Sequence, residues 1–219
     1  MFHFSVTPLA CLLVLLEATV CYLLGCINGA VLASRHFYQD DVRSHGSGNA
    51  GLTNFCRSYG AKRALCVVAV DMGKLFLSVA FFALIHRIFS YGNITVKEIY
   101  FSGLFCVLGH IFPVTAHFRG GKGVLCSAAL LLCLDWRIAL VGWGLFLLLT
   151  VTTRYVSLGS VCSALSFPIA TAFVYRSAVL TTVAFALALL VLWAHRENIR
   201  RLLHGEERRL HFGCGTPEP

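Results

Sequence analysis

Long apolar runs separated by short polar connections dominate the chain. The runs predict helices at about 5–33, 62–88, 97–116, 123–135, 137–153, 158–175 and 178–195. A helix needs roughly 20 mainly apolar residues to cross a bilayer, and most of the runs provide them. The 123–135 run would rise only about 20 Å, so it either thins the bilayer locally or is partly re-entrant. The pattern predicts an all-α integral membrane fold: a polytopic bundle of about seven transmembrane helices, or of five or six if short runs do not cross.

The composition places the chain among membrane proteins. Of its 219 residues, 58% are hydrophobic and 13% are charged, against about 25% charged in an ordinary soluble domain. We expect a single membrane domain over residues 1–219, with polar loops at about 35–61, 116–123 and 153–158 and a tail at 195–219. The net charge of +8 requires no nucleic acid partner, because basic cytoplasmic loops and anionic lipid headgroups account for it.

The distribution of Lys and Arg predicts the orientation, because these residues are retained on the cytoplasmic side during insertion. With the N-terminus outside, 13 of them lie in cytoplasmic segments and 4 on the other side, with Lys74 left inside a helix. We therefore expect the N-terminus outside and the C-terminus in the cytoplasm. The same choice puts every glycine-rich polar segment on the cytoplasmic side, where we expect the chemistry to occur.

The first polar segment has the composition of an anion site. Its sequence is Gly46-Ser47-Gly48-Asn49-Ala50-Gly51-Leu52-Thr53-Asn54, with Arg43 shortly before it. Glycine lets backbone N–H groups turn toward a bound anion, and a nearby Arg or Ser completes such a nest. The glycines also match G-x-G-x-x-G, but that dinucleotide fingerprint follows a β-strand, whereas a charged loop precedes them here. The segment therefore predicts phosphate binding.

A second polar segment holds a lysine among glycines. Gly109-His110-Ile111-Phe112-Pro113 is followed by Phe118-Arg119-Gly120-Gly121-Lys122-Gly123. This is not a Walker A sequence, because Ala116 and Gly123 stand where that motif needs Gly and Ser or Thr. The lysine opens a predicted helix, and a helix N-terminus with exposed amides favours an anion.

Two more segments carry polar residues at the ends of apolar runs. Arg154, Ser157 and Ser160 lie between two of the runs. His195 and Asn198 are three residues apart, so they share one face of a helix at the membrane boundary. A histidine at such a boundary is also often only a polar tip that reaches water.

Asp71 and Lys74 lie inside an otherwise apolar run, three residues apart. Charges at that depth are costly. We expect the two side chains to pair with each other or to face a polar interior, with structural support as plausible a role as substrate contact.

Taken together and in order, these motifs resemble the bacterial integral membrane acyl-phosphate:glycerol-3-phosphate acyltransferases. The motifs are the 46–54 segment, Gly109-His110-x-Phe112-Pro113, Gly120-Gly121-Lys122-Gly123, Arg154-x-x-Ser157-Leu158-x-Ser160 and His195-Arg196-x-Asn198-Ile199. The resemblance implies a seven-helix protein of the bacterial cytoplasmic (inner) membrane. It also implies transfer of a fatty acyl group from acyl phosphate to the sn-1 hydroxyl of glycerol 3-phosphate. The products would be lysophosphatidic acid and phosphate, in the first step of phospholipid biosynthesis.

The resemblance further implies roles for individual residues. The catalytic set would be Arg43, Ser47, His195 and Asn198. The substrate-binding set would be Asn49, Asn54, Gly120, Gly121, Lys122, Gly123, Arg154, Ser157 and Ser160. Glu207, Asp71 and Lys74 would brace the structure. The expected partners are the two substrates and membrane lipids, without cofactor or metal, for a monomer or weak oligomer.

The expected reaction depends mainly on how the site positions its two substrates. An acyl phosphate is a mixed anhydride with a good leaving group, so the site has to bring two phosphate-bearing substrates together and screen their repulsion. The sequence offers no obvious Ser-His-Asp set, which favours direct attack over an acyl-enzyme. The base would be His195 or the phosphate of the donor itself.

The chain departs from the family pattern at several positions. Cys26 and Asn28 stand where Ser-Ile-Pro is usual, Leu52 where alanine is usual, and Leu75 where glycine is usual. A divergent noncatalytic paralogue therefore stays open, as does a transporter for a phosphorylated or anionic solute. Transporters usually bind near the midplane between inverted repeats, whereas the polar residues here lie in loops on one side.

Overall fold

The computed structural model describes residues 8–89 and 92–210. These residues form ten α-helices and two 3₁₀ helices, which confirms the all-α prediction for this part of the chain. The elements are α1 (Pro8–Cys26), α2 (Gly29–Tyr38), η1 (Val42–Ser44), α3 (Leu52–Tyr59), α4 (Ala64–Ile88), α5 (Val96–Ile111), η2 (Val114–Ala116), α6 (Val124–Cys133), α7 (Trp136–Thr153), α8 (Val156–Tyr175), α9 (Ala178–Ala194) and α10 (Arg196–Leu203).

The prediction of one continuous helix over 5–33 is wrong. The described part of that run breaks between α1 and α2. Asn28 adopts an extended conformation and caps α2, its side-chain oxygen accepting a hydrogen bond from the Val31 amide at 2.9 Å. A cap of this kind satisfies an N–H group that the start of a helix leaves without an intrahelical partner. The apolar run hides the break, because hydropathy does not register backbone direction.

Two other expectations need correction. The helix predicted over 97–116 ends at Ile111, and η2 follows after Pro113, whose ring removes a backbone donor. The loop predicted at 35–61 contains the end of α2 together with η1 and α3, and the tail predicted from 195 contains α10. Residues 211–219 of that tail lie outside the described residues.

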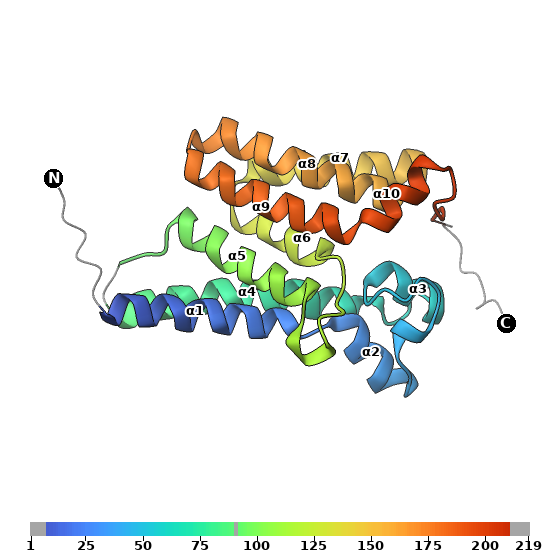
Figure 1. Cartoon of the computed structure of the whole chain (residues 1–219), viewed down its shortest axis with the longest axis horizontal. Helices are drawn as coiled ribbons and strands as arrows, with labels where there is room; N and C mark the ends of the chain where they lie inside the picture. The colour runs from blue at the N-terminus through green and yellow to red at the C-terminus, as the bar shows by residue number, and fades with distance from the viewer. Residues whose placement is uncertain (1–7, 90–91, 211–219) are drawn as a thin grey trace.

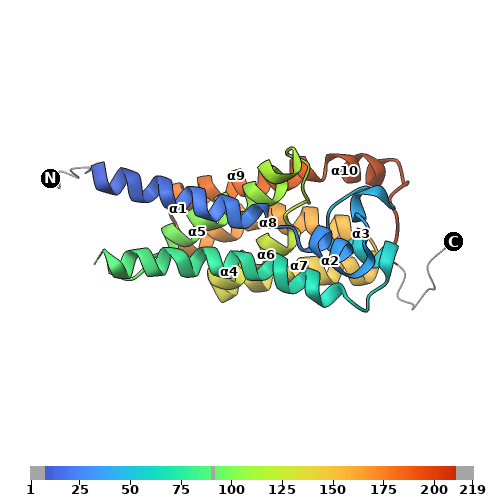
Figure 2. The same ribbon diagram turned by 90° about the horizontal axis from the view of Figure 1, so that it is seen from below.

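The long helices run side by side in one elongated bundle (Figures 1 and 2). The main core lies between helices α4 to α9, around buried Tyr100, Leu130 and Phe167. The Tyr100 hydroxyl shares a 2.6 Å hydrogen bond with the Thr171 hydroxyl, so this buried polar group is satisfied. A second cluster around Val42, Phe55 and Val67 fixes α2, η1 and α3 on α4. The elements that carry the polar segments thus rest on the bundle itself.

The outer face of the bundle is apolar. Leu65, Trp136 and Phe173 are 76%, 73% and 79% exposed, which is an arrangement that a lipid environment favours and water opposes. Five helical segments are long and apolar enough to cross a membrane: α1, α4, α5 with η2, α7 and α8. A sixth is obtained if α9 and α10, which meet at a 64° bend, count as one span. The short α6 has ten residues.

The expected pairing of Asp71 with Lys74 is confirmed. The Lys74 Nζ atom lies 3.1 Å from Asp71 Oδ1, and both side chains are 2% exposed. The pair lies on α4, where its charges contact the break between α1 and α2 and the end of α5.

Candidate functional site

The predicted polar segments gather at one end of the bundle. Elements α2, α3 and α10 lie at that end in both views (Figures 1 and 2). The segment 112–123 folds back there, because the Gly120 amide donates to the Ile111 carbonyl at 3.2 Å and the Gly121 amide to the His110 carbonyl at 3.1 Å. Segments from four parts of the sequence therefore share one polar end.

The loop between α2 and α3 is organised around Asn54, which is 2% exposed. Its side-chain oxygen accepts from the Ser47 amide at 2.9 Å and the Ser47 hydroxyl at 3.1 Å, and its nitrogen donates to the Val42 and His45 carbonyls. Gly46 has a φ of +58°, the left-handed region that glycine adopts most readily. The loop is therefore held in one shape, with Asn54 bound inside it.

Arg43 is fixed by its neighbour Asp41. The guanidinium donates to both carboxylate oxygens, at 2.9 Å and 2.7 Å. Hydrogen bonds from Arg43 hold the pKa of Asp41 well below its usual range, and the same contact raises the pKa of Arg43. Arg43 is thus a permanent cation with a set direction.

Arg43 lines a cavity together with Gly48, His117, Arg119 and Gly120. The cavity continues into a groove between α1, α2 and η2. Two guanidinium groups and a polar loop therefore face the same space, which suits an anion.

On the other side of the glycine segment, a chain of side chains runs from Lys122 to α10. The Lys122 ammonium donates to the side-chain oxygen of Asn198. The Asn198 nitrogen donates to Glu207 at 2.7 Å, and Arg201 donates to the second carboxylate oxygen of Glu207 at 2.8 Å. Lys122, Asn198 and Glu207 are thus brought together from distant parts of the sequence.

The charges in this cluster differ in their pKa. Burial lowers the pKa of Lys122 to about 8, with Arg201 and Arg57 acting in the same direction and Glu207 opposing. Burial would raise the pKa of Glu207, but hydrogen bonds from Asn198 and Arg201 outweigh it and lower that pKa. Near neutral pH the cluster therefore has three cations and one carboxylate.

His195 lies at the junction of α9 and α10 and is 2% exposed. Its Nδ1 atom lies 2.8 Å from the Val191 carbonyl, which can only accept. The proton of the neutral ring is therefore on Nδ1, and Nε2 is an acceptor.

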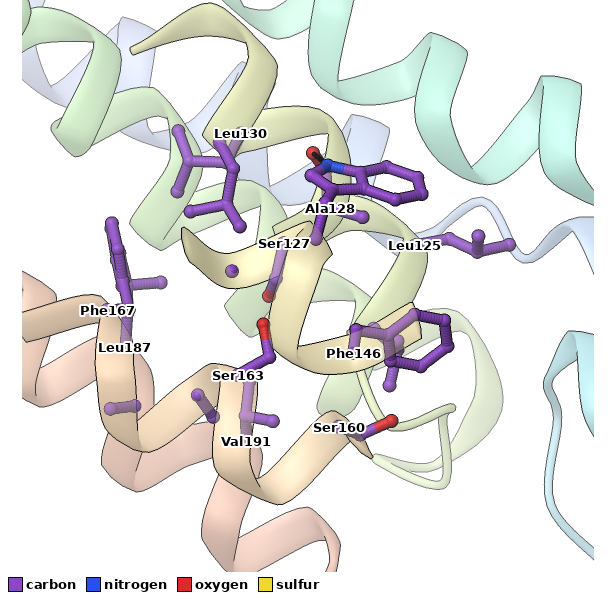
Figure 3. Close-up of a pocket in the computed structure, with 16 residues that line it drawn as sticks. Leu125, Ser127, Ala128, Leu130, Phe146, Ser160, Ser163, Phe167, Leu187 and Val191 are labelled. Atoms are coloured by element: carbon purple, nitrogen blue, oxygen red, sulfur yellow. Dashed lines mark hydrogen bonds between the residues drawn. The ribbon is translucent and has the colours of Figure 1, made fainter. Parts of the chain in front are cut away.

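An apolar pocket begins beside Lys122 and His195. Its lining includes Val124, two residues after Lys122, and Val191, the hydrogen-bond partner of His195. It encloses about 740 Å³, counting its open side. Figure 3 shows side chains of α6, such as Leu130, and of α8, such as Phe167, on its walls. The polar cluster thus adjoins a compartment suited to a hydrocarbon.

Not every predicted residue lies in this cluster. Ser160 lines the apolar pocket, and its hydroxyl donates to the Val156 carbonyl. Arg154 occupies the turn between α7 and α8, where its carbonyl accepts from the Leu210 amide at 2.7 Å. Ser157, buried in the first turn of α8, does adjoin the cluster, because its side chain interacts with Glu207 and helps to lower the pKa of that carboxyl.

Four further polar residues belong to the region but were missed as candidates: Arg57, Arg119, Arg201 and His110. A signal for His110 was present in the Gly109-His110 motif. Arg119 stands within the Phe118–Gly123 segment. Arg57 and Arg201 stand outside the motifs, and only the folding of α3 and α10 onto one end brings them to the site. In the described ranges, no group of three or more His, Cys, Asp and Glu side chains is placed to hold a metal ion.

Comparison with known proteins gives one consistent result. The family model described as glycerol-3-phosphate acyltransferase matches residues 15–205. The glycerol-3-phosphate acyltransferase of Finegoldia magna is 37% identical over 87% of this chain and 93% of its own length. That of Lactiplantibacillus plantarum is 35% identical over 92% of this chain and 94% of its own. The crystal structure of PlsY (YgiH), an integral membrane glycerol 3-phosphate acyltransferase in its glycerol 3-phosphate form, superposes with a TM-score of 0.77 at 34% identity. It covers 90% of this chain and 96% of that one.

Proposed function

The chain belongs to the glycerol-3-phosphate acyltransferase family of multi-pass membrane proteins, and we propose that it transfers a fatty acyl group from acyl phosphate to the sn-1 hydroxyl of glycerol 3-phosphate. The products are lysophosphatidic acid and inorganic phosphate. The observation that carries the proposal is the junction of the Lys122–Asn198–Glu207 cluster with the apolar pocket at Val124 and Val191.

The apolar pocket takes the acyl chain. Burying each methylene contributes about 0.8 kcal/mol, so even a partly buried chain supplies substantial affinity. A chain in this pocket leaves its polar head at the mouth, near Lys122, Asn198 and His195.

Glycerol 3-phosphate binds along residues 120–123, between Arg43 and Lys122. Both substrates carry phosphate, and the cations around this segment lower the repulsion between them. Ser47 and Asn49 contribute from the preorganised loop, and Ser157 from the start of α8. Asn54, Glu207, Asp71 and Lys74 hold these groups in place.

The reaction exchanges one C–O bond for another. The sn-1 oxygen attacks the acyl carbon, the bond from that carbon to the phosphate oxygen breaks, and phosphate leaves with the hydroxyl proton. Nε2 of His195 is an acceptor for that proton on its way, and the donor phosphate is the alternative acceptor. Lys122 and Arg43 stabilise the charge that develops on the leaving phosphate.

We further propose that the whole chain is one domain of the bacterial cytoplasmic membrane, with seven crossings. In this arrangement α6 forms the seventh, and the segment before it is a cytoplasmic loop. The N-terminus lies outside and the C-terminus in the cytoplasm, as the excess of Lys and Arg at the polar end favours. The enzyme acts as a monomer or weak oligomer.

The decisive experiment measures transfer of labelled glycerol 3-phosphate into lysophosphatidic acid by the purified protein. We expect product with palmitoyl phosphate and none with palmitoyl-CoA. A folded sample that gives no product with either donor would instead support a noncatalytic role. Product from palmitoyl-CoA would contradict the proposed donor.

A further inference from the structure

Three buried polar side chains lie away from the substrate groups, within the helices. As whole residues, Asp71, Lys74 and His110 are 1%, 3% and 4% exposed. Lys74 Nζ lies 3.1 Å from Asp71 Oδ1 and 2.7 Å from His110 Nδ1. Groups buried so completely are retained only where they are paired and hydrogen-bonded. Their contacts identify the backbone segments that these three side chains support.

The charged pair caps both sides of the helix break. Lys74 Nζ donates to the Gly25 carbonyl at 3.0 Å and to the Ile27 carbonyl at 2.5 Å, at the end of α1. Asp71 Oδ1 accepts from the Gly29 amide at 3.0 Å, at the start of α2. A cation thus meets the free carbonyls of one helix and an anion a free amide of the next, as the helix dipoles favour.

Lys74 also determines the state of His110. An ammonium group only donates hydrogen bonds, so His110 Nδ1 accepts, and the proton of the neutral ring is on Nε2. The Nε2 edge lies against Gly121. A Cβ atom at Gly121 would overlap His110 Nε2 and would lie 2.6 Å from the Ala50 carbonyl. The ring therefore supports the glycine segment directly beneath Lys122.

The glycine segment is also linked to the helix break through Asn28 and Ala50. The Asn28 side chain donates to the Ala50 carbonyl at 3.0 Å while it caps α2. The break, the 41–54 loop and the glycine segment therefore meet around Ala50 and Gly121. A shift of one would displace the others.

We propose that His110, held by Lys74 and Asp71, is a positioning residue that sets the place of the Gly120–Lys122 segment relative to the α1–α2 break. It acts through Lys122 and does not touch substrate. The inference rests on the proposed function, in which Lys122 contacts glycerol 3-phosphate.

The test compares His110→Asn and His110→Phe. Asparagine can still accept from Lys74 but withdraws from Gly121, whereas phenylalanine keeps the ring but offers no acceptor. Because small misplacements at a reacting site cost up to about 100-fold, we expect KM for glycerol 3-phosphate to rise about tenfold or more in both. KM for palmitoyl phosphate, set mainly by chain burial, should stay within about twofold. Ser78→Ala, a buried change one turn along α4 from Lys74, is the matched control and should leave both KM values unchanged.

A second readout does not depend on activity. Displacement of the glycine segment should expose Lys122, so an amine-reactive reagent should modify it several-fold faster in both variants than in the wild type, as read by mass spectrometry. Wild-type KM and wild-type labelling in either variant would overturn the proposal. So would equal rises in both KM values with a lowered unfolding midpoint, since that result indicates general support of the fold. If the wild type makes no lysophosphatidic acid, the proposed function fails, and the labelling comparison still decides the positioning role.

Discussion

Lys122 is a buried cation, and its burial disfavours the charged form of the side chain. Its pKa of about 8 means that it is charged below that pH and neutral above it. If the charged form binds glycerol 3-phosphate, affinity is complete well below pH 8, is halved near pH 8 and is lost as the pH rises further. We predict that kcat/KM for glycerol 3-phosphate falls about tenfold per pH unit above about pH 8, measured from pH 6.5 to 9.5.

Lys122→Arg provides the matched comparison, because a guanidinium stays charged throughout this range. Its activity should be lower, since Arg does not fit the contact with Asn198, but the alkaline fall should disappear. The same alkaline fall in both proteins would assign the titration to another group.

Single residues differ in how far the sequence revealed their role. The motif spacing correctly drew attention to Lys122 and Asn198, which lie together. The sequence could not show that the Gly120 and Gly121 amides are used within the fold, donating to carbonyls at the end of α5. Nor could it show that Gly121 is required by the His110 ring beneath it. Glycine suits both a phosphate loop and a close approach of backbones, and a sequence does not distinguish them.

At the scale of elements, the break between α1 and α2 depends on a residue in which this chain departs from the family pattern. Asn28 caps α2 and also donates to Ala50. Removing a cap costs about 1 kcal/mol. We predict that Asn28→Ala lowers the free energy of unfolding by about 1–2 kcal/mol and also reduces acyl transfer.

Asn28→Asp separates the two contacts, because a carboxylate can cap the helix but cannot donate to Ala50. We expect it to keep the cap but to lose about 1 kcal/mol of stability with the Ala50 hydrogen bond, measured by thermal unfolding in detergent, and to lose part of the activity. Full activity in the aspartate variant would show that the Ala50 contact is dispensable.

Elements α6 to α9 form the walls of the apolar pocket, which predicts where acyl length is sensed. Ala164 lines the pocket, whereas its neighbour Leu165 is 49% exposed on the outer face. Ala164→Phe should exclude about two methylenes and raise KM for palmitoyl phosphate roughly tenfold. A short donor such as octanoyl phosphate should be affected less. Leu165→Phe should leave KM for both donors unchanged. Equal rises in KM for the long and the short donor would mean that the acyl chain binds elsewhere.

The helices themselves were largely predictable, for a physical reason. Apolar runs such as those that form α7 and α8 have to be helical in lipid, because every backbone group must find a partner within its own segment. The elements that build the site follow other rules. The Asn28 cap, the turn after Pro113 and the short helices α3 and α10 depend on side-chain hydrogen bonds and tertiary packing, which hydropathy does not register.

At the scale of the whole molecule, the number of crossings decides whether the two termini lie on the same side of the membrane. The first helix begins at the end of the bundle opposite to α10 (Figure 1), an arrangement that agrees with the odd number of crossings proposed above. The helix α6, at about 1.5 Å per residue, rises only about 15 Å, half of a 30 Å bilayer. The segment before it folds back onto the end of α5. In the proposed seven-crossing arrangement this fold recesses the polar end, and α6 crosses only the remaining depth.

This geometry predicts the sides on which two points of the chain lie. Fluorescent protein fused after Pro219 should fluoresce in the cytoplasm, and alkaline phosphatase fused there should be inactive. Phosphatase fused at Asp135, between α6 and α7, should be active because the seven-crossing arrangement puts that connection outside. Inactive phosphatase at Asp135 would contradict the seven-crossing arrangement, because it would place the connection between α6 and α7 in the cytoplasm. Since the 13 cytoplasmic Lys and Arg of the seven-crossing arrangement include those of the candidate site, the same measurement decides which side of the membrane supplies glycerol 3-phosphate.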